Sequence, residues 1–114
     1  MIETTILNYL SETVEVPVYM EEPEDPPESY LVLEKTGSGQ ENRVQSATFA
    51  IQSYGASLYD AAVLNENVKE AMEHIATLDA IGSAKLNGDY NFTDPETRRY
   101  RYQAVYNIFY VKEN

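Results

Sequence analysis

Residues 42–75, NRVQSATFAIQSYGASLYDAAVLNENVKEAMEHI, contain the two clearest hydrophobic periodicities of the chain. Over Val44–Ser53 the apolar side chains recur at every second position, which is typical of a strand with one buried face. Over Leu58–Ile75 they recur every three or four residues, which is typical of an amphipathic helix. Gly55 separates the two patterns, where a reversing chain needs backbone freedom, and Ser57 is a candidate N-cap. We therefore predict a strand, a tight turn and a helix that covers the strand.

The core of this unit can be predicted from the same periodicities. The strand face would pack against the apolar face of the helix, and each large side chain that is fully buried contributes about 1.5–3 kcal/mol. The predicted core residues are Ala47, Phe49 and Ile51 on the strand and Leu58, Ala61, Leu64, Val68, Ala71, Met72 and Ile75 on the helix.

The composition is that of one acidic domain without cysteine. The 114 residues include 19 acidic and 8 basic side chains, which gives a net charge of −11. Residues 1–34 contain no Lys or Arg. Such a chain repels nucleic acid and anionic lipid, and it has neither a secretory signal nor an apolar run of about 20 residues. We expect a soluble protein made in the cytoplasm, with no membrane partner and no disulfide.

The N-terminal third predicts a helix, a short strand and a hairpin. Apolar residues at helical spacing indicate a helix over residues 2–13, and Val16–Met20 reads as an edge strand because it contains a proline. The acidic, proline-rich segment 21–28 is interpreted as a solvated connector, with a cation site or docking arm as the alternative. Tyr30–Lys35 is predicted to be a central strand, and residues 36–42 a mobile polar loop.

The C-terminal third predicts a second hairpin. Ala84–Phe92 and Arg98–Val111 alternate in polarity, and Asp94-Pro95 between them starts a tight turn. On the first strand we expect one face to carry Ala84, Leu86, Tyr90 and Phe92. On the second strand one face carries Tyr100, Tyr102, Ala104, Tyr106, Ile108 and Tyr110.

The predicted order of elements is helix, strand, hairpin, helix, hairpin. Antiparallel strands with helices at two points indicate the α+β class. We predict a single domain over residues 1–114, with one mostly antiparallel sheet of about five strands and two helices packed on one face. The opposite face would then be left with tyrosine and valine side chains, an apolar surface that a monomer seldom exposes.

No group of residues in the sequence indicates catalysis or a cofactor. The single histidine, His74, has only Glu70 as a possible partner at helical spacing. Gly37 and Gly39 are not followed by the Gly-Lys-Ser/Thr of a phosphate loop. Acidic pairs are too frequent to be informative, so we expect no enzyme, no metal site and no cofactor. A small hydrolase that uses carboxylates is the weakest hypothesis, and a carboxylate with a raised pKa in a pocket would favour it.

Four segments carry a resemblance to a known family. The N-terminal helix leads into VPVY at 16–19, and YLVLEKTGSG follows at 30–39. The long helix carries SLYDAAVLNENVKEAM at 57–72, and the closing hairpin is YNFTDPETRRYRYQAVYNIFYV at 90–111. In that hairpin a polar turn precedes Arg101-Tyr102-Gln103 and an aromatic strand. In this layout the chain resembles the tail terminator and tail-completion proteins of long-tailed bacteriophages.

The resemblance implies a structural role in the virion tail. Proteins of this family form a ring, commonly a hexamer, on the last layer of tail-tube protein, where they end tube polymerisation and join the tail to the head connector protein. DNA passes through the ring and is not specifically bound. The protein would be assembled in the host cytoplasm. The alternative is a small oligomeric adaptor or neck protein that acts through its exposed sheet face.

Two segments of opposite charge are candidates for contacts between subunits. A closed ring of more than two subunits requires two different and complementary surfaces on each subunit. The acidic segment 21–28 and the cluster of arginines at positions 98, 99 and 101 form such a pair. The tyrosines of the last strand offer a further contact surface. The candidate interface residues are Glu21, Glu22, Glu24, Asp25, Glu28, Arg98, Arg99, Arg101, Tyr100, Tyr102 and Tyr106.

Overall fold

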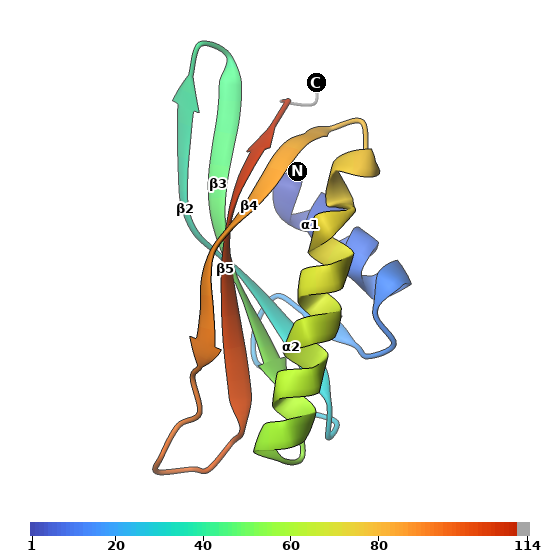
Figure 1. The fold of residues 1–114 in the computed structure, drawn as a ribbon, viewed down its shortest axis with the longest axis vertical. Helices are drawn as coiled ribbons and strands as arrows, with labels where there is room; N and C mark the ends of the chain where they lie inside the picture. The colour runs from blue at the N-terminus through green and yellow to red at the C-terminus, as the bar shows by residue number, and fades with distance from the viewer. Residues whose placement is uncertain (112–114) are drawn as a thin grey trace.

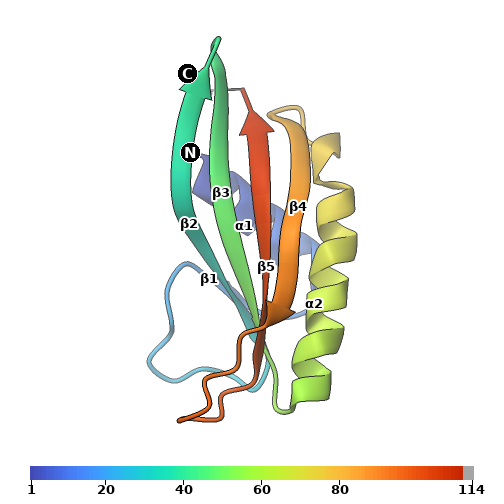
Figure 2. The same ribbon diagram turned by 60° about the vertical axis from the view of Figure 1, so that its left-hand side comes forward.

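The computed structural model describes residues 1–111 and contains one five-stranded sheet with both helices on one side of it (Figure 1). The strand order is β1-β2-β3-β5-β4, and only β1 and β2 run parallel. In Figure 2 the strands lie in front and α1 lies behind them. The predicted α+β class is confirmed. The elements are α1 (Ile2–Thr13), β1 (Val18–Tyr19), β2 (Tyr30–Glu41), β3 (Val44–Tyr54), α2 (Leu58–Glu73), the 3₁₀ turn η1 (Ile75–Thr77), β4 (Ile81–Asn91) and β5 (Arg101–Tyr110).

The start of α2 is fixed by a side-chain cap and by a close backbone contact. The hydroxyl of Ser57 accepts a hydrogen bond of 3.0 Å from the backbone N–H of Asp60, so the predicted cap is confirmed. Gly55 does not have the positive φ that a turn glycine often adopts. Instead, a Cβ atom at this position would lie 2.5 Å from the backbone nitrogen of Ala61. Glycine is therefore needed because the end of β3 passes close to the first turn of α2.

The hydrophobic core lies between the two helices and one face of the sheet. The predicted packing of α2 on β3 is confirmed, since Val68, Met72, Phe49 and Ile51 belong to one buried cluster. The prediction for Leu58 is wrong, because this side chain is 39 % exposed in the first turn of α2. The buried cluster as a whole comprises Ile2, Ile6, Leu10, Val14, Leu31, Leu33, Ala47, Phe49, Ile51, Leu64, Val68, Ala71, Met72, Ile75, Ile81, Ala104, Tyr106 and Ile108.

The first hairpin is longer than the sequence predicts, and the first strand is shorter. Residues 36–41, predicted to be a mobile loop, continue β2 and pair with the start of β3. The connection is only Asn42 and Arg43, both with positive φ, as in the two-residue turns that suit β-hairpins. Pairing with β3 thus overrides the weak strand propensity of TGSGQ. β1 is confined to two residues, and β2 lies between two strands only at Leu31 and Val32.

Both β2 and β4 contain a register shift near the middle of the sheet, on either side of the row formed by Phe49 and Tyr106. In β2 the shift lies between Lys35 and Gly37, and in β4 it lies between Leu86 and Gly88; β4 has a further shift at its start, between Ile81 and Ser83. An extra residue in one strand reverses the face to which all later side chains point. Leu86 therefore pairs with Tyr106 on the helix side, whereas Tyr90 pairs with Gln103 on the opposite side. The prediction that Ala84, Leu86, Tyr90 and Phe92 share one face is wrong for this reason.

The tyrosine row of β5 faces the helices. Tyr106 is 4 % exposed and belongs to the core, and Tyr110 packs against the core. The prediction of an uncovered, tyrosine-rich sheet face is therefore wrong for this strand. Two apolar faces were available on β5, and α2 covers the one that also carries Ala104 and Ile108. We call the side of the sheet away from the helices the open face; on β3 and β5 it carries Ser46, Thr48, Ala50, Gln52, Tyr54, Arg101, Gln103, Val105, Asn107 and Phe109.

Candidate functional site

The acidic loop and the arginine cluster meet within one subunit. Nη2 of Arg99 lies 2.5 Å from Oε1 of Glu22, and the hydroxyl of Tyr30 donates a hydrogen bond of 2.5 Å to the same carboxylate oxygen. Arg99 also donates a hydrogen bond to the Tyr30 hydroxyl oxygen. Burial, together with the Glu22 carboxylate, raises the pKa of the Tyr30 hydroxyl. These three side chains connect the 20–29 loop, the start of β2 and the turn before β5.

Two stacked tyrosines and a second arginine extend this cluster. The rings of Tyr30 and Tyr54 are parallel to within 5°, with their centroids 4.5 Å apart. The guanidinium of Arg101 donates to the Tyr54 hydroxyl at 2.7 Å and to the Phe92 carbonyl at 2.7 Å. It also lies 4.5 Å from the centre of the Phe92 ring, which is within the range of a cation–π contact. The arginine charges are thus held by aromatic rings at one end of the sheet.

A pocket of about 530 Å³ lies beside the cluster at this end of the open face. Its charged lining combines two arginines, Arg99 and Arg101, with four carboxylates; the lining residues are Met20, Glu21, Glu22, Val32, Glu34, Gln52, Tyr54, Asp94, Thr97, Arg99 and Arg101. Backbone N–H groups of the 94–97 turn lower the pKa of the Asp94 carboxyl, so this group remains charged at neutral pH. The pocket can receive a polar or charged side chain of a partner.

The structure separates the other predicted interface residues from this cluster. Among residues 1–111, Glu24, Asp25, Glu28 and Arg98 are exposed and have no ion-pair partner. Arg98 has a positive φ of 56°, which directs the chain out of the turn and into β5. Tyr100 and Tyr102 are half-buried, and Tyr106 lies in the core. Tyr106 is therefore not accessible to a partner in this conformation of the subunit.

Two polar networks were not foreseen from the sequence. On the open face, Gln52 donates to Gln103 at 2.9 Å, and Gln103 donates to the Tyr90 hydroxyl at 2.6 Å. Beside it, Thr48, Asn107 and Asn87 form a second chain of hydrogen bonds across β3, β5 and β4. Cross-strand register brings these residues together, and a single strand does not reveal that register. Polar residues at alternate positions of β3 and β5 were the only available signal.

A further network joins α2 to β4 on the helix side. Oδ1 of Asp89 accepts hydrogen bonds from Asn65 at 2.9 Å and from Lys69 at 3.2 Å. Glu66 and Asp89 raise the pKa of the Lys69 ammonium. Burial raises the pKa of the nearby Tyr106 hydroxyl to about 12. The contacts of Asp89 with Asn65 and Lys69 hold the outer strand β4 against α2.

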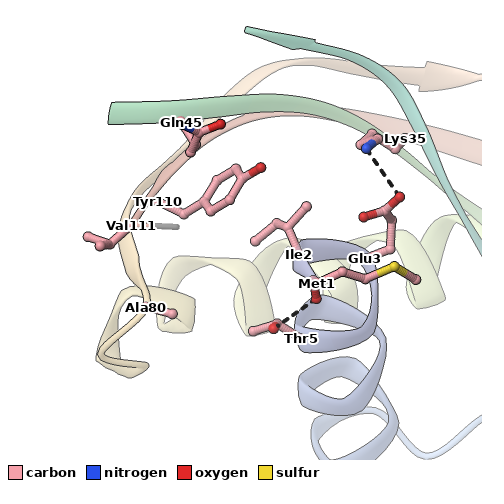
Figure 3. A pocket seen from close by; sticks show the side chains of 9 residues that line it. All are labelled: Met1, Ile2, Glu3, Thr5, Lys35, Gln45, Ala80, Tyr110 and Val111. Atoms are coloured by element: carbon pink, nitrogen blue, oxygen red, sulfur yellow. Dashed lines mark hydrogen bonds and ion pairs between the residues drawn. The ribbon is translucent and has the colours of Figure 1, made fainter. Parts of the chain in front are cut away.

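A second pocket, of about 460 Å³, lies where the start of α1 faces the ends of β5 and β3 (Figure 3). Ile2 and Tyr110 supply apolar surface, and Lys35 forms a 3.2 Å ion pair with Glu3 at its edge. A backbone N–H at the start of α1, and then Lys35, lower the pKa of the Glu3 carboxyl. This ion pair links α1 to β2.

The described part of the chain shows no metal site. Across residues 1–111, no three His, Asp or Glu side chains come together in an arrangement that could hold a metal ion. His74 caps the C-terminal end of α2 through its backbone N–H. No helix in residues 1–111 is both long and apolar enough to cross a membrane. No protein-family model matches this sequence, and no curated protein matches it either.

Proposed function

We propose that the protein is a structural subunit of a bacteriophage tail, which caps the tail tube as a ring and joins it to the head connector. The proposal rests on the resemblance of four segments to tail terminator and tail-completion proteins. Proteins of that family are small α+β proteins, and the α+β class of this chain is compatible with the proposal.

The observation that best supports this proposal is the pair of dissimilar edges of the sheet. Beyond the two residues covered by β1, the outer edge of β2 from Leu33 to Glu41 has no strand neighbour among residues 1–111. The outer edge of β4 has none either within that part of the chain. A ring requires two different surfaces on each subunit, and these two edges lie on opposite sides of the sheet (Figure 2). Unpaired strand edges are ready to bind another chain through backbone groups.

The net charge agrees with a channel for DNA. Each subunit carries −11, and a negatively lined channel lets DNA pass without adhering to it. Neighbouring subunits would repel each other overall, so matched patches must bring them into register. Because Glu22 and Arg99 already pair within the subunit, the partnerless charges are better candidates for contacts between subunits. Arg98 and Glu24 are two of these exposed charges.

The decisive experiment is co-expression with the tail-tube protein of the same phage or prophage. Negative-stain electron microscopy should then show tubes of limited length with a ring at one end. Arg98→Glu should weaken capping, and Glu24→Lys in the same chain should restore part of it. Arg43→Glu, at the hairpin tip, is the control of equal charge change. Tubes that grow without limit in the presence of the folded protein would refute the proposal.

The alternative is a small oligomeric adaptor or neck protein that acts through its exposed sheet face. The pocket beside Glu22, Arg99 and Arg101 favours it, because this pocket opens on the open face and combines both signs of charge. An adaptor of this kind would bind the connector protein without limiting tube length. Pull-down with the connector and with the tube protein separately distinguishes the two functions.

A further inference from the structure

The middle of the open face has few charged side chains compared with the rest of the protein. Between the levels of Ser46 and Gln52, β2, β3, β5 and β4 form four cross-strand rows of four residues. Only Glu34 and Lys85 among these sixteen positions are charged, although 24 % of the chain is charged and most of that charge is on the surface. Val32, Ala50 and Gln103 are buried within the subunit, and the other positions are half-buried or exposed. Depletion of charge over such a surface is characteristic of the centre of a protein interface.

The face also retains exposed apolar side chains. Phe109 is 43 % exposed and Val44 is 47 % exposed, and both lie at the end of the face near the β2–β3 turn. Glu34 is the acidic side chain within these rows, whereas Glu41 lies beyond them at the β2–β3 turn and the acidic pocket lies at the other end of the face. A second molecule that contacts only the four rows therefore meets less of the repulsion that the −11 charge produces elsewhere.

Two glycines of the face are not required by the subunit itself. Gly37 and Gly88 both have φ outside the positive range, and a Cβ atom on either would meet no atom within 4 Å. Gly37 shares a row with Lys85 at the opposite edge of the sheet, and Gly88 shares the next row with Glu34. Glycine within a strand often marks a place where another chain comes close.

We propose that the part of the open face formed by these four rows binds a second copy of this chain. A two-fold axis parallel to the strands, midway between the two faces, would place β2 over β4 of the other copy and β3 over β5. This rotation leaves each cross-strand row at the same level along the strands, so each row of one copy faces the same row of the other. Lys85 of each copy therefore lies over Gly37 of the other, and Glu34 lies over Gly88.

The same arrangement pairs the two charges that lie within the four rows. Glu34 of one copy and Lys85 of the other lie one row apart along the strands. Because packed sheets lie about 10 Å apart, these two long side chains can reach each other across the interface. Neither residue has an ion-pair partner in its own subunit among residues 1–111. Two symmetric Glu–Lys contacts thus close the two sides of the dimer, and the small residues let the faces approach.

The small size of the surface indicates a weak dimer. Four rows across four strands cover roughly 27 Å by 19 Å, or about 500 Å² on each copy. The total of about 1,000 Å² is at the low end for specific complexes, so we expect a reversible dimer with a dissociation constant between about 10 µM and 1 mM. This inference does not depend on the proposed tail function, because a ring would use other surfaces of the subunit.

Sedimentation equilibrium of the whole protein, from about 10 µM to 1 mM, tests the proposal. Glu34→Lys and Lys85→Glu should each raise the dissociation constant of the dimer about tenfold. Each change replaces two attractive Glu–Lys contacts per dimer by two repulsive contacts between like charges. The double variant should return to within about threefold of the original protein. Glu70→Lys, an exposed charge reversal on α2, is the matched control and should not weaken the dimer.

Gly37→Gln and Gly88→Gln provide an independent test, because a Cβ atom at either position meets no atom of its own subunit within 4 Å. Both variants should keep the circular dichroism spectrum and melting temperature of the original and lose the dimer. A protein that stays monomeric at 1 mM, or a dimer unaffected by all four face variants, would overturn the proposal. So would a larger ring as the only oligomer, with assembly unchanged in these variants; that outcome would leave the tail-capping function intact.

Discussion

Replacement of Val68 by aspartate tests the packing of α2 on the sheet. Val68 is 0 % exposed and lies in the same buried cluster as Phe49 and Ile51, so the substitution places a carboxyl group in the core. Loss of the valine side chain costs about 1.5–2 kcal/mol in transfer free energy. A buried polar group without a hydrogen-bond partner costs a further 2–7 kcal/mol or so.

These costs are comparable with the whole stability of the domain. At about 0.05–0.15 kcal/mol per residue, a chain of 114 residues has a free energy of unfolding of about 6–17 kcal/mol. We therefore expect Val68→Asp to be unfolded or close to unfolding at 25 °C. Burial keeps the new carboxyl protonated in the folded state, while the unfolded state ionises above a pKa of about 3.9. The loss of stability should therefore grow as the pH rises above about 4.

Urea denaturation followed by circular dichroism measures the effect. Val63, on the same helix, is 41 % exposed, so Val63→Asp is the matched control and should change stability by less than about 0.5 kcal/mol. Val68→Ala removes only two methyl groups and should cost about 2 kcal/mol, which keeps the test quantitative if the aspartate variant does not fold. Equal midpoints for Val68→Asp and Val63→Asp would show that this face of α2 does not pack on the sheet.

Three further substitutions test local features of the fold. Gly55→Ala should destabilise by about 1–3 kcal/mol, because its Cβ would overlap the backbone of α2, whereas Gly37→Ala should be nearly neutral; similar melting temperatures would contradict the close contact. Ser57→Ala should cost about 1 kcal/mol through loss of the N-cap, measured by urea denaturation, and an unchanged midpoint would argue against the cap. Lys35 is one of the groups that lower the pKa of the Glu3 carboxyl in the folded state. A lowered pKa stabilises the fold at pH values above the ordinary pKa of 4.5, and this stabilisation is lost as the pH falls below it. Lys35→Gln removes that contribution. The variant should lose less stability than the original between pH 5 and pH 3, by under about 1 kcal/mol, and identical pH profiles would exclude the coupling.

The comparison of sequence and structure separates two kinds of information. The periodicity over Val44–Ser53 and Leu58–Ile75 was sufficient to predict β3, α2 and their contact, because the alternation of apolar residues depends only on the geometry of one element. The cap at Ser57 is equally local, since it satisfies backbone groups within one turn. The class of the fold follows from the order of such elements along the chain.

The candidate site could be predicted only in part. The acidic loop and the arginine cluster were recognised from their charge, but the sequence did not show that Glu22 and Arg99 meet inside one subunit. It also gave no role to Tyr30 and Tyr54, whose rings stack only because the two strands pair in this register. A site made of residues from four segments requires the tertiary structure.

The length of the first hairpin and the assignment of faces were decided by pairing between strands. Residues 36–41 have weak strand propensity alone and become strand because β3 offers them hydrogen-bond partners. The register shifts beside Gly37 and Gly88 reverse the faces of β2 and β4, and no pattern within one strand specifies such a shift. Tyr106 is buried because α2 covers its side of β5. Local patterns therefore determined which elements form, and only the packing of those elements determined which side chains they bury and which they leave for a partner.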